Sequence, residues 1–268
     1  MDIELIVLVK QVPLTGEVEV DPETGNLIRE GIESQTNPFD LHAIEAALYL
    51  RERFGGRVTA LSMGPPQAEA TVRETFSMGV DRGILLSDPA FAGADTLATA
   101  FTLARAIELV PHDLVVAGMQ TTDGDTAQVG PGVAEFLGIP HASYVKEIGE
   151  IEDGERIAVS VDRGEEEHRV QLHLPALVTV TREVNQPRLP SFRLRLQTAD
   201  RPVEIWNREE LTRDPDADGE DYFGLDGSPT WVERIFPPPG NPKRETWRGD
   251  SRELAGRLLD RLEEWRYL

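Results

Sequence analysis

The segment GMQTTDGDTAQVGPGVAEFLG (118–138) resembles a phosphate-binding loop that runs into a helix, yet it contains no lysine or arginine. Glycine N–H groups and a helix N-terminus can hold a pyrophosphate without a cationic side chain. The small residues Thr126, Ala127 and Gly130 permit the close approach that such binding needs. The segment lacks the lysine of a Walker motif, and it contains no GxGxxG. It therefore predicts a nucleotide that is held mainly by backbone donors.

A helix cap is the alternative interpretation of this segment. Asp125 followed by Gln128 fits a capping box in which Asp125 is the N-cap residue. That register would put Pro131 at the sixth helical position, where its missing N–H and its ring disfavour a helix. A later start, with Pro131 in the first turn, leaves residues 119–128 as a loop. We therefore favour the ligand-binding interpretation.

The carboxylates of this region need an explanation of their own. Asp113 lies just upstream of the loop, and Asp123 and Asp125 lie within it. Like charges 4 Å apart repel by about 4 kcal/mol at an effective dielectric constant of 20, so we expect the carboxylates to turn away from a phosphate. Neutralisation would then come from N–H groups and the helix dipole. The expected cradle consists of Asp123, Gly124, Thr126, Gln128 and Gly130.

Two further motifs fall at strand ends. NPFD (37–40) by itself is better explained as a turn that Asn-Pro initiates and whose following helix Asp40 caps. SMGPP (62–66) can likewise be a turn that ends a strand. Both gain weight as binding segments because the carboxyl ends of parallel strands lie at one edge of a sheet, where ligands bind.

Strand and helix patterns alternate over the first 140 residues, which predicts an α/β fold with a doubly wound, mostly parallel, Rossmann-like sheet. We expect strands at 3–10, 57–63, 83–87 and 113–118, and helices at 40–54, 66–79 (ended by Gly79), 94–110 and from about 131 to 137.

The pattern changes along the rest of the chain. ASYVKEIGEI, RIAVSVDRG and HRVQLHLPALVTVT predict three more strands, with an antiparallel hairpin around EDGE (152–155). All four tryptophans lie after residue 200, and nine of the 19 prolines fall between Pro187 and Pro242. Such a segment has to bury its aromatic side chains against the core or another chain. We predict a core at 1–184 and, at 185–268, an added arm with a C-terminal helix (251–265) capped by Ser251.

Composition excludes several classes of function. A net charge of −21 argues against nucleic-acid binding and against an anionic membrane surface. The absence of cysteine excludes disulfides, iron–sulfur clusters and thiolate zinc sites. The five histidines have no metal-ligand spacing, and no catalytic triad is recognisable. No apolar run is long enough to span a bilayer, and the N-terminus does not resemble a signal peptide, so we expect a cytoplasmic protein without direct membrane insertion.

The ordered motifs together resemble the β subunit of electron transfer flavoproteins. They are VKQVP, VDPETGNLIREG, NPFDLHAIEAAL, MGPPQAEATVRE, MGVDRGILLSD, GADTLATA, DGDTAQVGP, LPALVTVTRE, GSPT and WRGDSRELAGRLLDRL. The resemblance runs from residue 3 to the C-terminus. It implies a heterodimer with an α subunit that carries redox-active FAD, and an arm that contacts this partner.

Members of this family hold either AMP or a second FAD in the β subunit. DGDTAQVGP resembles the electron-bifurcating branch of anaerobes and nitrogen fixers, whose β-subunit FAD takes a hydride from NADH and splits the electron pair. FAD is therefore the expected cofactor, NAD a transient ligand, and structural AMP in a non-bifurcating carrier the alternative. The nucleotide contacts that the resemblance implies are Leu8, Val9, Lys10, Asn37, Pro38, Phe39, Asp40, Ser62, Met63, Gly64, Gly118, Gln120, Asp123, Gly124, Asp125, Thr126, Ala127, Gln128, Val129 and Gly130. Met119 stands where the family usually has a basic residue.

The resemblance also implies partners. NQPRLPSFRLRL (185–196) corresponds to the loop with which the family docks dehydrogenases or quinone oxidoreductases, and Leu189 is its candidate apolar anchor. An alternative from another class is a regulator of the universal-stress type, which shares the core architecture but needs no α subunit. A self-sufficient regulator has no use for about 80 Pro- and Trp-rich residues, so we favour the flavoprotein.

Overall fold

The computed structural model describes residues 2–14, 33–164, 166–212, 222–233 and 245–268. The described residues up to Glu233 form one compact unit. The described C-terminal residues, 245–268, belong to a second unit. The boundary after Val184 stays a prediction, and the first unit extends past it. The motif VDPETGNLIREG (20–31) lies outside the described residues.

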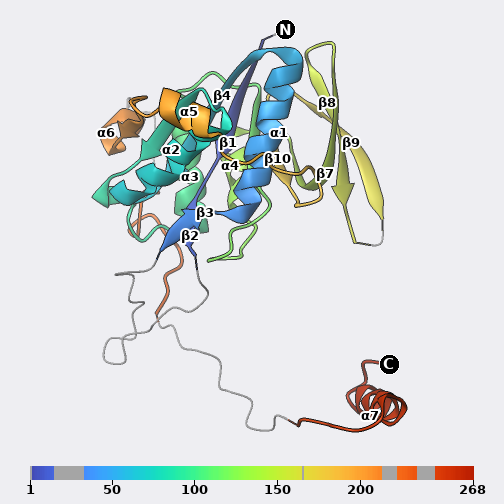
Figure 1. The fold of residues 1–268 in the computed structure, drawn as a ribbon. Coiled ribbons are helices and arrows are strands. Elements are labelled where there is room, and N and C mark those ends of the chain that lie inside the picture. The colour runs from blue at the N-terminus through green and yellow to red at the C-terminus, as the bar shows by residue number, and fades with distance from the viewer. Residues whose placement is uncertain (1, 15–32, 165, 213–221, 234–244) are drawn as a thin grey trace. The chain divides into compact units, whose positions relative to one another are not determined.

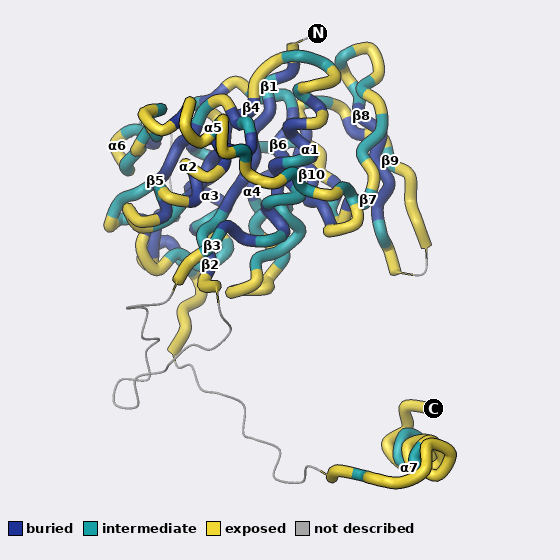
Figure 2. Tube along the Cα trace, in the orientation of Figure 1, coloured by how far each residue is buried: buried dark blue, intermediate teal, exposed yellow. Residues whose placement is uncertain are grey.

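Five parallel strands form the centre of the sheet, and the sequence predicts four of them, those at 3–10, 57–63, 83–87 and 113–118. The described strands pair in the order β11-β5-β4-β1-β6-β10-β7-β8-β9. Helices cover both faces of the centre, so its strands are buried on both sides and are almost continuously apolar (Figure 2). The five central strands are β1 (Ile3–Leu8), β4 (Gly56–Met63), β5 (Arg82–Leu86), β6 (Leu114–Gly118) and β10 (Ala176–Val180).

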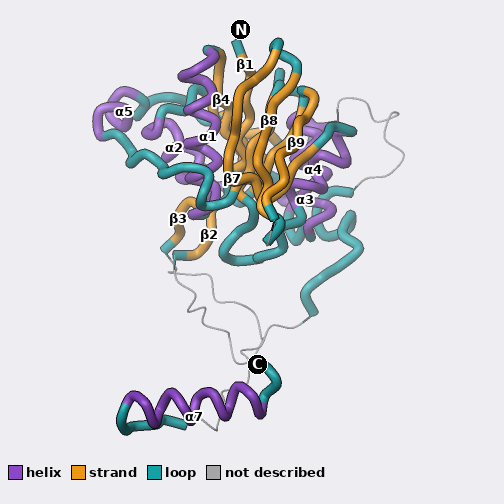
Figure 3. Tube along the Cα trace, turned by 90° about the vertical axis from the view of Figure 1, so that its right-hand side faces the viewer, coloured by secondary structure: helices purple, strands orange, loops and turns teal. Residues whose placement is uncertain are grey.

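Four helices form the outer layers. Helices α1 (Pro38–Phe54) and α2 (Glu69–Met78) cover one face, and α3 (Thr96–Ile107) and α4 (Val129–Leu137) cover the other. Figure 3 shows the two pairs on opposite sides of the strands. The 3-10 turn Pro66–Ala68 precedes α2, and Gly79 ends α2 in the left-handed conformation, as predicted.

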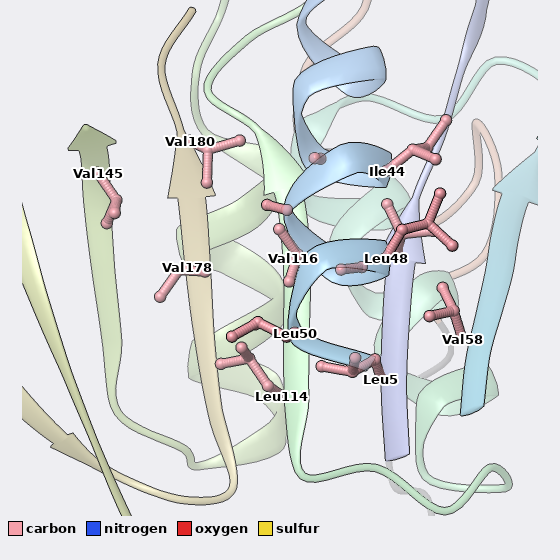
Figure 4. Close-up of a cluster of buried hydrophobic side chains, with 14 of the residues drawn as sticks. Leu5, Ile44, Leu48, Leu50, Val58, Leu114, Val116, Val145, Val178 and Val180 are labelled. Atoms are coloured by element: carbon pink, nitrogen blue, oxygen red, sulfur yellow. The ribbon is translucent and has the colours of Figure 1, made fainter. Parts of the chain in front are cut away.

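Alternate residues of each strand supply the two halves of the core. Leu5 and Val7 of β1 face α1, while Ile6 and Leu8 contribute to the cluster beneath α3 and α4. Figure 4 shows Leu5, Ile44 and Leu48 among the buried side chains between α1 and the sheet. Each fully buried aliphatic side chain contributes about 1.5–3 kcal/mol. The core therefore holds the strand ends at fixed positions.

An antiparallel meander extends the sheet at one edge (Figure 1). Its strands are β7 (His141–Glu152), which pairs parallel to β10, and then β8 (Arg156–Asp162) and β9 (Glu167–His173). The hairpin around residues 152–155 is confirmed. The expectation of one strand over HRVQLHLPALVTVT is wrong, because the chain leaves β9 before Pro175 and returns to the sheet as β10. Proline has no N–H to donate to a ladder, so a strand cannot pair normally through it.

The segment after Val184 adds short elements to the same unit. These are α5 (Phe192–Gln197), β11 (Glu204–Trp206) and α6 (Arg208–Leu211). Strand β11 pairs with β5, and Arg82 joins the two strands through a 2.7 Å ion pair with Glu204. A small separate hairpin is formed by β2 (Gln11–Pro13) and β3 (Ser34–Thr36).

The second unit contains helix α7 (Ser251–Glu264), which the sequence predicts. Its N-cap is Asp250, whose side chain accepts a hydrogen bond from the N–H of Arg252, so the prediction of Ser251 as the cap is wrong by one residue. No residue of this helix is buried against the described residues. Leu258 and Leu259 are about half exposed, at 50% and 53%.

Candidate functional site

The carboxyl ends of β1, β4, β6 and β10 meet at one edge of the sheet, and the loop of residues 119–128 follows β6 there. Helix α4 begins at Val129, with Pro131 in its first turn, so the loop interpretation is correct and the capping box with Asp125 is not formed. Asp113 lies at the opposite end of β6, where it accepts a hydrogen bond from the N–H of Glu4 at 2.8 Å. It therefore belongs to no cluster with Asp123 and Asp125.

Asn37 joins the start of α1 to this loop. Its side chain is fully buried and donates to the carbonyl oxygen of Gln120 at 2.9 Å and to Oδ1 of Asp40 at 2.8 Å. Its Oδ1 accepts from the N–H of Thr122 at 3.3 Å. An amide can do this because it carries both donors and an acceptor. NPFD is thus more than a turn, and Asn37 fixes the loop against the helix.

Asp40 lies inside α1 and caps nothing, which corrects the simpler interpretation of NPFD. Its Oδ2 accepts from the N–H of Lys10 at 2.8 Å. Burial raises the pKa of Asp40 to about 7, although hydrogen bonds from Asn37, Lys10 and Gly118 and the charge of Lys10 act in the other direction. A β-carbon at Gly118 would lie 2.4 Å from Oδ1 of Asp40, so only glycine fits at the end of β6.

Lys10 brings a positive charge to the loop. Its Nζ lies 2.7 Å from Oδ2 of Asp123, and both side chains are partly exposed. Partial burial works to raise the pKa of Asp123, but hydrogen bonds from Lys10 and Thr121 and the charge of Lys10 leave that pKa below its usual value. The expectation of a loop without any cation therefore needs correction, because Lys10 reaches it from the segment after β1, 113 residues before Asp123.

The loop backbone presents donors to its surroundings. Asp125 and Ala127 have positive φ angles of 53° and 54°, and the side chain of Gln120 donates to Asp125. Among the described residues, no acceptor is recorded for the backbone N–H groups of residues 126–130, as expected before and at a helix start. Adjacent N–H groups at a helix N-terminus suit an anion.

Two neighbouring elements support this loop. Gly130 is buried, and a β-carbon there would lie 2.4 Å from Cγ2 of Thr179 in β10. Oγ1 of Thr96, in the first turn of α3, donates to the side chain of Gln128 at 3.0 Å. The sequence analysis identified Gly130 and Gln128 but missed Thr96 and Thr179, because only tertiary packing brings these two to the loop.

The remaining predicted contacts line the other side of the edge. Leu8 and Val9 are buried, while Met63 and Gly64 are partly exposed. Within the described part of the chain, Oγ of Ser62 is the buried side-chain polar atom that has no hydrogen-bond partner. A buried hydroxyl without a partner costs about 1–3 kcal/mol, so this atom can accept or donate a further hydrogen bond.

The sequence analysis missed Arg182, which follows β10. Its Cζ lies 4.4 Å from the ring centroid of Phe39, next to Asn37. A basic residue two positions after the end of a central strand is a signal that could have identified it, since strand ends gather at this edge of the sheet.

The predicted docking residue lies on a different element. Leu189 is 87% exposed, and the neighbouring Arg188 binds Glu45 and Glu52 of α1 at 2.7 and 2.6 Å. In the described ranges, no group of potential ligands could hold a metal ion. No helix among them is both long enough and apolar enough to cross a bilayer.

Comparison with known proteins gives consistent matches over almost the whole chain. The family described as "Electron transfer flavoprotein domain" matches residues 24–211. The chain is 43% identical to an electron transfer flavoprotein subunit beta of Thermoanaerobacterium thermosaccharolyticum, over 96% of this chain and 97% of the relative. It is 44% identical to the caffeyl-CoA reductase-Etf complex subunit CarD of Acetobacterium woodii, over 97% and 98%. It is 40% identical to protein FixA of Bradyrhizobium diazoefficiens, over 96% and 90%.

Proposed function

Since this chain belongs to the electron transfer flavoprotein family, as a β subunit similar to those of the anaerobe and nitrogen-fixation branch, we propose that it works by flavin-based electron bifurcation. In this proposal it pairs with an α subunit and passes electrons between NADH or an acyl-CoA-type dehydrogenase and their acceptors. The similarity to CarD and FixA supports this choice over a simple carrier.

The cofactor proposed for this chain is FAD, bound at the edge where the loop 119–128 lies. The supporting observation is the donor set: N–H groups of residues 126–130 without acceptors among the described residues, beside the exposed ammonium of Lys10. These groups fit a pyrophosphate, which FAD has and which needs donors rather than bases. The unpartnered hydroxyl of Ser62 offers one further hydrogen bond to the nucleotide.

Each residue has a limited task in this proposal. When bound, FAD would supply hydride and single-electron chemistry that no side chain of the protein can provide. Asn37 and Gly118 hold the loop close to α1, and Lys10 and the loop N–H groups offset phosphate charge. Asp123 and Asp125 are engaged by Lys10 and Gln120, so their carboxylates are held by protein donors.

A second candidate is a non-bifurcating carrier that holds structural AMP at the same site. The donor set fits the phosphate of AMP as well, so the count of cofactors decides. The experiment is to purify the chain with its α subunit, release the ligands by heat, and quantify FAD and AMP. Two FAD molecules per heterodimer and no AMP are expected, whereas one FAD with one AMP would contradict the proposal.

A control variant assigns the second flavin to this chain. Gly118→Ala should remove one FAD of the two, because its β-carbon would meet Asp40 Oδ1 at 2.4 Å and push the loop from α1. The α-subunit flavin should remain.

A regulator of the universal-stress type would need no α subunit. Copurification of the two subunits in a stable heterodimer would be evidence against that alternative.

The proposed docking site for dehydrogenases or quinone oxidoreductases is the segment around Leu189. Leu189, Phe192 and Leu196 are 87%, 75% and 63% exposed, and they lie on and just before α5. Large apolar side chains that are exposed together mark interaction surfaces. Arg188 fixes the start of this segment on α1.

A further inference from the structure

Arg182 lies beside the loop, two residues after the end of β10. The N–H of Met119, the first loop residue after β6, donates to the carbonyl oxygen of Val180 at 3.0 Å. Arg182 follows Val180 by two residues, and its side chain is directed toward α1, where Cζ lies 4.4 Å from the Phe39 ring centroid. The guanidinium is therefore held at the junction of β6, β10 and the start of α1.

Phe39 is part of the same edge. A β-carbon at Gly118 would lie 2.8 Å from Cβ of Phe39, so the end of β6 and this residue are in direct contact. Asn37, two residues earlier, binds the carbonyl oxygen of Gln120 in the loop. Because Phe39 contacts the end of β6, the Arg182 guanidinium that stacks on it lies at the same edge as the loop.

The charges at this edge differ in how far they are already neutralised. Lys10 is paired with Asp123 at 2.7 Å, and Asp125 accepts from Gln120. For Arg182, no carboxylate lies within ion-pair distance among the described residues, and the residue is exposed. Stacking on an aromatic ring uses the face of a guanidinium and leaves its N–H edge for an anion. Arg182 thus keeps its donors available.

We propose that Arg182 is a phosphate-binding residue of the nucleotide site and supplies a second cation beside Lys10, one that is not paired with a carboxylate of the described residues. The guanidinium would bind phosphate oxygens of AMP or FAD while Phe39 holds it in orientation. Arginine suits this task because its planar donors match phosphate geometry. The proposal rests on the proposed function only in that this edge takes a phosphate-bearing nucleotide.

The test compares ligands with and without phosphate. The heterodimer would be stripped of nucleotide, and binding of AMP, FAD and adenosine would be measured by calorimetry for the wild type, Arg182→Ala and Arg182→Lys. Arg182→Ala should weaken the binding of AMP and FAD about tenfold or more and leave the affinity for adenosine unchanged, since Arg182 would contact only phosphate oxygens. Arg182→Lys should lie between, because it keeps the charge but loses the planar donors.

A matched control is Arg169→Ala, which removes an exposed arginine from β9, three strands from β10 in the sheet order. It should bind all three ligands like the wild type. Unchanged AMP and FAD affinity in Arg182→Ala would overturn the proposal, as would an equal loss for adenosine, which would mean that Arg182 acts only by packing on Phe39. A wild type that binds no nucleotide would overturn the nucleotide site itself, and this role with it.

Discussion

A β-carbon at Gly130 would lie 2.4 Å from Cγ2 of Thr179, so this glycine is required for α4 to pack on β10. The sequence suggested that a small residue at position 130 lets a ligand approach. The atom that an added β-carbon would meet first, however, belongs to Thr179 of the protein itself. Gly130→Ala should therefore destabilise the heterodimer by about 1–3 kcal/mol through overpacking and lower its nucleotide content. Differential scanning calorimetry and nucleotide release measure the two effects.

A second substitution separates the two explanations. Thr179→Ser removes Cγ2 and keeps the hydroxyl that accepts from the N–H of Tyr144 at 3.2 Å. The double variant Gly130→Ala/Thr179→Ser should regain both stability and nucleotide. A double variant that is stable but empty would instead show that Gly130 faces the ligand.

Met119→Ala should keep full nucleotide content, because Met119 binds Val180 through its backbone.

Asp40 makes stability depend on pH. Its folded-state pKa of about 7 exceeds the usual 3.8, so folding binds a proton between these values. The contribution of this group is complete below about pH 3.8 and is lost as pH rises through about 7, by up to about 1.4 kcal/mol per pH unit. Asp40→Asn does not titrate, so the Tm of this variant relative to wild type should increase from pH 5 to pH 7.

The nearby Asp123 provides a control of opposite sign. Partial burial works to raise the pKa of Asp123, but hydrogen bonds from Lys10 and Thr121 outweigh it, so the pKa is lowered. Its contribution is present above the unfolded-state pKa and is lost as pH falls below it. Asp123→Asn should therefore differ from wild type by a constant Tm between pH 5 and pH 8. A constant difference for Asp40→Asn as well would contradict the raised pKa of Asp40.

At the scale of elements, Arg188 positions the proposed docking segment around Leu189. It donates to Glu45 and Glu52, which lie on α1, and its own N–H donates to Glu45 at 3.0 Å. These bonds raise the pKa of Arg188 and lower that of Glu52. Arginine forms such bidentate contacts because its donors are planar and preorganised. The segment that presents Leu189 is therefore attached to the helix that also begins at the proposed nucleotide site.

Two substitutions test this arrangement. Arg188→Met should free the segment, so that backbone amides of residues 187–197 exchange hydrogen faster, and should raise KM for the partner dehydrogenase several-fold. Leu189→Ala should raise KM without faster exchange, because it removes an apolar contact and no attachment. Both variants should keep their flavins. An unchanged KM in both would contradict docking at this segment.

At the scale of the whole molecule, α7 is a helix without a buried face. Its leucines Leu254, Leu258, Leu259 and Leu262 lie on one side at helical spacing, and none is buried. An apolar stripe that stays exposed in one chain needs a partner surface. Leu258→Asp/Leu259→Asp should therefore abolish copurification with the α subunit. Gly256→Asp, which adds a carboxylate away from this stripe, should preserve it, and assembly of the double variant would contradict the role of α7.

The amino-acid sequence by itself determined the fold class and predicted the sheet edge at which the candidate site lies. Apolar runs of IELIVL, ALSM and LVVAG alternate with helical periods, and such local patterns suffice for a parallel sheet because each element satisfies its own backbone and buries one face. Pro131 excluded the capping box with Asp125 for a purely local reason, its missing N–H. These features depend on neighbours in the chain, which a sequence contains.

Only the tertiary structure decided which distant side chains meet. Lys10 reaches Asp123 across 113 positions, and Arg182 reaches Phe39 because β6 and β10 pair. Asp40 looked like a cap but lies buried beside Lys10 and Gly118, and β9 and β10 are separate strands although the sequence there resembles a single strand. Electrostatic and packing energies depend on distance in space, and this distance is set when all strands and helices are packed together.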